Sequence, residues 1–164
     1  MTLLSPGMLL VSTAIMDDPY FKQTVVLITE YNDSGAMGFV LNRRFPRVFN
    51  ELVEFRSYPP LPLYEGGPVD QEHLFFIHRC PDQISGGTVV SGTLSAGGDF
   101  KQALSYMSRA GRAEQEVRLF IGYCGWDKDE LETEISAGYW LVMPVPGNTF
   151  IFSDPEHIWK ALHN

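Results

Sequence analysis

The sequence predicts an α+β fold built on a mostly antiparallel sheet. Strand-like apolar runs are interspersed irregularly with short helical segments, and tight hairpins join some of them, which favours antiparallel pairing over a doubly wound parallel sheet. The clearest hairpin has two apolar runs, residues 25–28 and 37–41, joined by the polar turn 31–35. Neither run alternates apolar with polar residues. Because such strands have both faces covered by protein, we expect this hairpin to lie at the centre of the sheet.

Length and composition are those of one globular domain spanning residues 1–164, with 45% hydrophobic and 20% charged residues. No apolar run reaches the roughly 18 residues that a membrane-spanning helix needs. Residues 1–14 carry no basic side chain, and a Pro-Gly pair interrupts their apolar stretch, unlike a signal peptide. We therefore expect a cytoplasmic protein.

The charge balance argues against a general nucleic-acid binder. Twenty acidic against twelve basic residues give a net charge of −8, and proteins bind phosphate backbones by neutralising them with Lys and Arg. Arg43, Arg44 and Arg47 form the only tight basic cluster in the sequence. A solvated cluster and a local basic patch both remain open for these three residues.

The first half of the chain contains other short elements. Residues 17–19 predict one helical turn, because an acidic side chain caps free N–H groups and proline suits the first helical position. Residues 48–56 predict a short helix with Asn50 as its cap. Three prolines within residues 58–62 require an extended connector. Brief apolar runs predict strands at residues 8–11, 63–65, 74–77 and 88–90.

The second half contains the best predicted helix, residues 95–111. Its apolar residues recur at helical spacing, Ser95 or Asp99 can cap it, and Gly111 suits the left-handed position after its end. A buried strand is predicted at 117–123. A helix at 128–137 follows, opened by a capping box of Asp127 and Glu130 and closed by Gly138. The chain then has a strand pair at 139–143 and 149–152 and a last helix starting at 154–155.

Searches for catalytic motifs return one weak match. Asp33-Ser34-Gly35 is the signature tripeptide of aspartic proteases, which need two carboxylates sharing a proton. It occurs once, in a polar turn, so a plain hairpin turn is the favoured interpretation unless a homodimer brings two copies together. The sequence has no G-x-S-x-G elbow and no phosphate loop. His73 and His78 flank one strand at an odd offset and point to opposite faces, so we expect no metal and no cofactor.

Two glycine-bearing turns are the strongest candidates for a ligand site. Gly66-Gly67-Pro68 and residues 122–126 each follow an apolar strand, and successive glycines let backbone N–H groups converge on an anion. The second turn leads into a capped helix whose amino end also favours anions, although Asp127 can occupy that end itself. Trp126 can serve as a ligand platform or as a core residue. Plain tight turns and anion-binding turns both remain open.

Several blocks of sequence together resemble the bacterial AlgH/YqgE family. They are DPYF at 18–21, GAMGFVLNR at 35–43, GGPV at 66–69, GYCGW at 122–126, LETE at 131–134, and Trp140. The resemblance covers nearly the whole chain and implies a bifurcated sheet that closes into a pseudo-barrel. It implies little chemistry, since the family's label of transcriptional regulator comes from a genetic link to alginate production and its members carry no recognised DNA-binding motif. This chain departs from the family pattern at residues 129–130 and 138–140, around the Gly-Trp turn.

Three readings of function follow. The first is a non-enzymatic binding or regulatory module with an unknown small ligand or protein partner, because no nucleophile–base or metal constellation is visible. The second is a sensor or enzyme for a small anionic ligand, such as a nucleotide or phosphate-bearing molecule, with Arg43 as the anion clamp. Its site residues are expected to be Asp18, Arg43, Gly66, Gly67, Gly125, Trp126 and Glu132. The third is a DNA-bound regulator, which the net charge disfavours. Cys80 and Cys124 lack C-x-x-C spacing and are expected to be reduced, with a disulfide left open.

Overall fold

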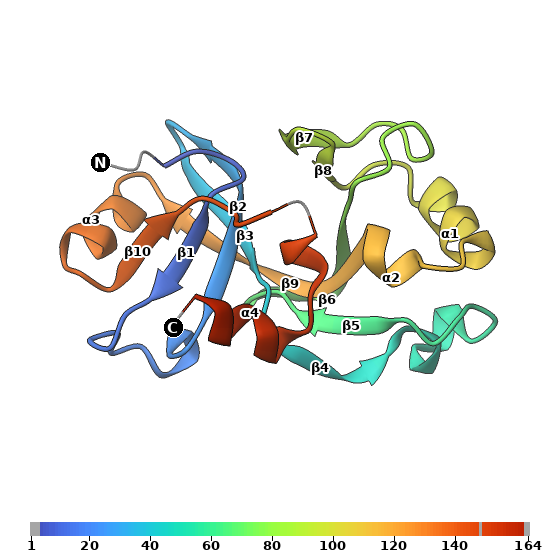
Figure 1. Ribbon diagram of the computed structural model, residues 1–164, viewed down its shortest axis with the longest axis horizontal. Helices are drawn as coiled ribbons and strands as arrows, with labels where there is room; N and C mark the ends of the chain where they lie inside the picture. The colour runs from blue at the N-terminus through green and yellow to red at the C-terminus, as the bar shows by residue number, and fades with distance from the viewer. Residues whose placement is uncertain (1–3, 148, 163–164) are drawn as a thin grey trace.

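A computed structural model describes residues 4–147 and 149–162 (Figure 1). In this part of the chain ten strands form one sheet. They are β1 (Leu9–Ser12), β2 (Val25–Asn32), β3 (Gly35–Val40), β4 (Arg44–Val48), β5 (Pro62–Glu65), β6 (Val69–His78), β7 (Thr88–Ser91), β8 (Leu94–Ala96), β9 (Val117–Asp127) and β10 (Trp140–Met143).

The helical elements are short. They are α1 (Phe100–Arg109), α2 (Ala113–Glu116), α3 (Glu130–Ser136) and α4 (Pro155–Ala161), with the 3-10 turns η1 (Pro19–Phe21), η2 (Phe49–Glu51), η3 (Val53–Phe55) and η4 (Phe150–Phe152). Within the described ranges, no helix is both long and apolar enough to cross a membrane.

The sheet branches at β9. Its main path runs β10-β1-β2-β3-β9-β6-β8-β7, and β5, with β4 beside it, also pairs with β9. Every pair is antiparallel except β5 with β9, so the predicted mostly antiparallel α+β fold is confirmed. The expected closure into a pseudo-barrel is wrong, because β10 and β7 end the path without pairing with each other. Strand β9 crosses the middle of the molecule in Figure 1 and joins the two parts of the sheet.

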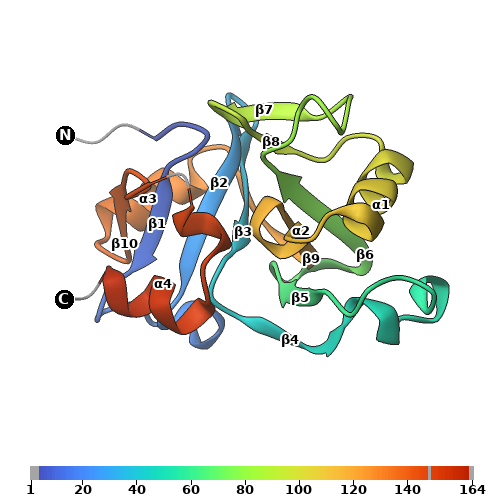
Figure 2. The same ribbon diagram turned by 45° about the vertical axis from the view of Figure 1, so that its right-hand side comes forward.

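The central hairpin of β2 and β3 is confirmed. Residues 25–28 are fully buried: Val25 and Leu27 pack in one hydrophobic cluster, and Val26 and Ile28 in another on the opposite face. Helix α4 covers the first face and α3 the second (Figure 2). The turn is tighter than predicted, because β2 continues to Asn32 and β3 begins at Gly35.

The predicted caps and ends of the helices are confirmed in part. The cap of η1 by Asp18 and that of α1 by Asp99 are confirmed, as is the left-handed Gly138 after α3. Helix α1 is shorter than predicted, because Ser95 lies in β8. The predicted end of this helix is also wrong, since the helix stops at an extended Ala110 and not at a left-handed Gly111.

Three further elements differ from their predictions. The helix predicted over 48–56 is two 3-10 turns, and Asn50 lies inside η2, whose cap position is Val48. The strand predicted over 149–152 is the 3-10 turn η4. Strand β9 continues through residues 122–126, so the predicted Gly-Trp turn is wrong. Both cysteines are free and buried.

Candidate functional site

Arg43, the predicted anion clamp, lies between β3 and β4 and bonds to residues of this chain. Its Nη2 donates to the carbonyl oxygen of Tyr20 at 2.6 Å and to Oγ1 of Thr24 at 3.1 Å. Its guanidinium carbon lies 4.5 Å from the centre of the Tyr20 ring. Its Nη1 is 3.8 Å from Oε2 of Glu65, and the Tyr20 hydroxyl donates to that same oxygen at 2.5 Å. Arg43 therefore ties the η1 segment to β5.

The electrostatics of this cluster favour a neutral phenol. Burial, and then the bond to Glu65, raise the pKa of Tyr20 well above its ordinary value. Nη1 of Arg43 is buried and has no hydrogen-bond partner among the described residues. This nitrogen is a donor that Arg43 still has for an anion, so the clamp stays a prediction.

Asp18 contributes to the same cluster indirectly. Its carboxylate accepts from the backbone N–H of Tyr20 at 2.9 Å and caps η1. An acidic cap fixes the first turn of a helical segment by satisfying a free donor. Asp18 therefore orients the loop that carries Tyr20.

Gly66 and Gly67 follow β5 and lie against the backbone of β9. A Cβ on Gly66 would lie 2.4 Å from the carbonyl oxygen of Gly122, and one on Gly67 would lie 2.1 Å from the carbonyl carbon of Tyr123. The N–H of Gly66 donates to the carbonyl oxygen of Ile121 at 2.8 Å. These glycines allow two backbones to approach closely, and the Gly66 amide is used within the sheet.

Gly125 and Trp126 lie in β9, where they pair with β3. Trp126 is buried, and its indole Nε1 donates to Oε1 of Glu134 at 3.1 Å. Nε1 of Trp140 donates to the same oxygen at 2.9 Å. Trp126 is therefore part of the core beneath α3.

Glu132 projects from α3 and accepts a hydrogen bond from the hydroxyl of Tyr31 in β2. This bond is the main cause that raises the pKa of Tyr31 above its ordinary value. The structure thus brings Asp18, Arg43 and Glu65 together through Tyr20, whereas Glu132 takes part in a separate contact between α3 and the hairpin.

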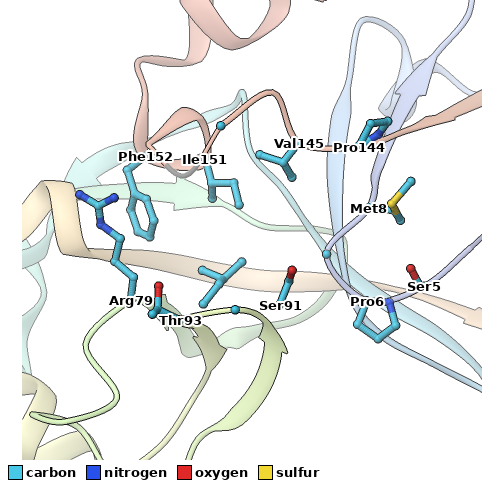
Figure 3. Close-up of a pocket in the computed structure, with 14 residues that line it drawn as sticks. Ser5, Pro6, Met8, Arg79, Ser91, Thr93, Pro144, Val145, Ile151 and Phe152 are labelled. Atoms are coloured by element: carbon cyan, nitrogen blue, oxygen red, sulfur yellow. The ribbon is translucent and has the colours of Figure 1, made fainter.

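A different site lies between the amino-terminal segment, the β7–β8 turn and the residues that follow β10. A cavity of about 530 Å³ is lined by residues 5–8 of the amino-terminal segment, by residues 91–94 at the β7–β8 turn, and by Arg79, Pro144, Val145, Gly147, Ile151 and Phe152 (Figure 3). In the close-up, Arg79 and Phe152 lie at one end, and Pro6 and Met8 at the other. Such a volume lies within the range of small-molecule sites, roughly 300–1,000 Å³.

Arg79 follows β6 and is held by Glu116 at the end of α2. Its Nε donates to Oε2 of Glu116 at 3.0 Å and its Nη2 to Oε1 at 3.4 Å. The guanidinium carbon lies 5.5 Å from the centre of the Phe152 ring. A second hollow of about 270 Å³ also reaches Arg79 and is lined by Gln115, Thr149 and Phe152. Arg79 and Phe152 thus line both hollows, and Glu116 holds the guanidinium.

The carboxy-terminal wall of the cavity is fixed by Arg118. This side chain is almost fully buried in β9, and it donates to the carbonyl oxygens of Ile151 and, at 2.7 Å, Ser153. Burial lowers the pKa of Arg118. These two bonds hold η4 and the residue after it against β9.

No spacing motif connects the residues of this cavity. Arg79 and Ser91 come together through the pairing of β6 with β8 and of β8 with β7, and local sequence patterns do not indicate these pairings. The one local signal is an arginine two positions after the strand predicted at residues 74–77, which is too common a pattern to identify a site.

The molecule is thus an α+β protein with a branched sheet and a cavity between its amino-terminal segment, the β7–β8 turn and η4. The chain belongs to the AlgH-like family, whose sequence model matches residues 9–164. A UPF0301 protein of Bacteroides thetaiotaomicron is 32% identical over 157 residues, which cover 95% of this chain and 80% of that protein. Membership confirms the resemblance seen in the sequence blocks and assigns no activity.

Solved structures agree with this family. The solution structure of the AlgH protein from Pseudomonas aeruginosa matches with a TM-score of 0.73 and 30% identity, covering 99% of this chain and 90% of that one. Protein DIP2367 of Corynebacterium diphtheriae matches with a TM-score of 0.79 and 21% identity, covering 98% of this chain and 86% of that one. Because protein DIP2367 is 21% identical to this chain, its similarity shows a shared fold alone.

Proposed function

We propose that this protein is a non-enzymatic, cytoplasmic binding module that holds a small molecule in the 530 Å³ cavity. The cavity is the observation that carries the proposal. It combines apolar walls from Met8, Val145 and Ile151 with a few polar groups, which is the composition of small-ligand sites. Two free, buried thiols suit a reducing compartment.

The chemistry of the cavity walls supports binding over catalysis. Among the described residues that line it, Arg79 is the one ionisable side chain. The hydroxyls of Ser5, Ser91 and Thr93 have no base among those residues, and a hydroxyl nucleophile needs one within hydrogen-bond reach. A regulatory role fits the same site, because a ligand there would contact the amino-terminal segment, the β7–β8 turn and the residues that follow β10, and could favour one arrangement of them.

The other two readings have less support. Gly66 and Gly67 are packed against the β9 backbone, and Arg43 is bonded to Tyr20 and Thr24. These contacts leave little room for an anion beside Gly66 and Gly67. For direct DNA binding, the net charge of −8 is unfavourable. Arg44 of the basic cluster lies 3.9 Å from Asp154, which further reduces the patch.

The proposal is tested by a thermal-shift screen with nucleotides, sugar phosphates and organic acids. A ligand at about 100 times its dissociation constant should stabilise the fold by roughly 2.7 kcal/mol. Thr93→Trp places a large side chain at the cavity and should abolish the shift. Val53→Trp, at an exposed position of η3, is the matched control and should retain it. A shift that persists in Thr93→Trp would place the ligand elsewhere.

A further inference from the structure

We infer that the cavity selects small organic acids with an apolar body, and that Arg79 binds the acidic head. This inference rests on the proposed binding function and specifies its ligand class. It starts from the single positive charge at the cavity. A guanidinium has five N–H donors, and Glu116 occupies those of Nε and one of Nη2. These two bonds leave the Nη1 side of the fork able to donate to a ligand.

The surroundings of Arg79 suit an acidic head group. The smaller hollow beside it is lined by the amide of Gln115 and the hydroxyl of Thr149, both of which can donate to a carboxylate or phosphate oxygen. Phe152 lies against the guanidinium and restricts its orientation. Bidentate pairing with carboxylate or phosphate depends on such an oriented, planar fork.

The opposite end suits an apolar body. Pro6, Met8 and Pro144 lie there in Figure 3 beside the hydroxyl of Ser5, with Val145 and Ile151 between them and the Arg79 end. No acidic or basic side chain of the described residues lines that end. A ligand that places its charge at Arg79 would therefore remove its hydrocarbon part from water along this wall.

Glu116 limits the affinity for such a ligand. It neutralises Arg79 and lies on the same guanidinium that a ligand anion would contact, so the two negative charges repel. Removing the charge of Glu116 while keeping its size should therefore strengthen acid binding. A purely structural role for Glu116 predicts the reverse, because the variant would then loosen Arg79 and weaken binding.

The test compares octanoate with the neutral octanamide by calorimetric titration of the full chain. Octanoate should bind at least about tenfold more tightly, since a hydrogen bond to a charged group contributes roughly 1.5 kcal/mol or more. Arg79→Gln should reduce octanoate affinity to that of octanamide and leave octanamide affinity unchanged, which also shows that the variant is folded. Glu116→Gln should strengthen octanoate binding. Arg109→Gln, an arginine on α1 bonded to Gln83, is the control and should change neither.

Each contrary outcome is distinct. Equal affinity for octanoate and octanamide in every variant would overturn the role of Arg79 and leave the proposed cavity binding intact. Absence of binding by either compound, together with no hit in the thermal-shift screen, would overturn both. Inorganic phosphate at the same concentration should bind more weakly than octanoate, and tighter binding would exclude an apolar body. Cosedimentation of the protein with phosphatidylglycerol vesicles would overturn the proposal of a free organic acid and indicate a membrane lipid as the ligand.

Discussion

Arg118 lies inside the protein with its guanidinium carbon 3.7 Å from the centre of the Tyr64 ring. The ring, from β5, provides a cation–π contact in place of a paired carboxylate. The guanidinium donors reach the carbonyl oxygens of Ile151 and Ser153. One buried cation thus joins β9, β5 and the segment that forms the cavity wall.

Replacing Arg118 with methionine should lower the free energy of unfolding by at least about 2 kcal/mol. The physical reason is that two carbonyl oxygens lose their donors, and a buried polar group left unsatisfied costs roughly 1–3 kcal/mol. Urea denaturation followed by circular dichroism measures the change. Arg112→Met is the matched control at an exposed position and should stay within about 0.5 kcal/mol of wild type. An unchanged midpoint for Arg118→Met would show that these carbonyls find other donors.

Glu134 should be needed for the packing of both tryptophans beneath α3. Its Oε1 accepts from Nε1 of Trp126 and of Trp140. Glu134→Ala leaves two indole donors without a partner and should cost about 1–3 kcal/mol. Glu134→Gln keeps a carbonyl acceptor of similar size and should recover most of that loss. Urea titrations monitored by tryptophan fluorescence report both quantities, and equal losses in the two variants would contradict the hydrogen-bond account.

The sequence predicts the hairpin well because its information is local. Residues 25–28 are apolar on both faces, and the structure buries them on both faces. The turn predicted at residues 122–126 is part of strand β9 in the structure, and this difference has a physical reason. Glycine marks turns and close backbone approaches alike, and here Gly122 serves the approach of Gly67 within the sheet. Only the tertiary structure distinguishes these uses.

The candidate cavity could not be predicted in the same way. Arg79 and Glu116 are 37 positions apart, and their meeting depends on the register of β6 against β9. By contrast, the sequence did single out Arg43, whose neighbours in the chain are distinctive. What it could not show is that Tyr20 and Thr24 already accept hydrogen bonds from that guanidinium.

Arg43→Ala separates a structural role from the predicted role of anion clamp. The variant loses the bonds to Tyr20 and Thr24, so we expect a loss of about 1–3 kcal/mol in the free energy of unfolding. The response to octanoate should persist after correction for stability, because the acid is proposed to bind at Arg79. Titration at a temperature where both proteins are folded measures this. A response that disappears in Arg43→Ala and survives in Arg79→Gln would move the site to Arg43.

His78 should make the fold sensitive to mild acid. It is fully buried, its Nδ1 accepts from the backbone N–H of Cys80 at 3.1 Å, and its Nε2 lies 3.1 Å from the carbonyl oxygen of Gly97. The ring therefore carries its proton on Nε2 and is neutral. Burial lowers its pKa below the ordinary value of 6.5. Protonation at Nδ1 would also direct a second N–H at that of Cys80.

The sign of the effect follows from this lowered pKa. In acid the unfolded chain binds a proton at His78 before the folded chain does, so the contribution to stability is present above pH 6.5 and is lost as the pH falls below it. His78→Gln should flatten that part of the pH profile of unfolding free energy, while lowering stability at neutral pH.

His73 is the matched control, since its exposed bond to Asp70 raises its pKa and gives a contribution of opposite sign. His73→Gln should therefore leave the loss below pH 6.5 in place or make it steeper. Urea titrations at intervals between pH 5 and 8 measure all three profiles, and a His78→Gln profile parallel to wild type would assign the acid sensitivity to other groups.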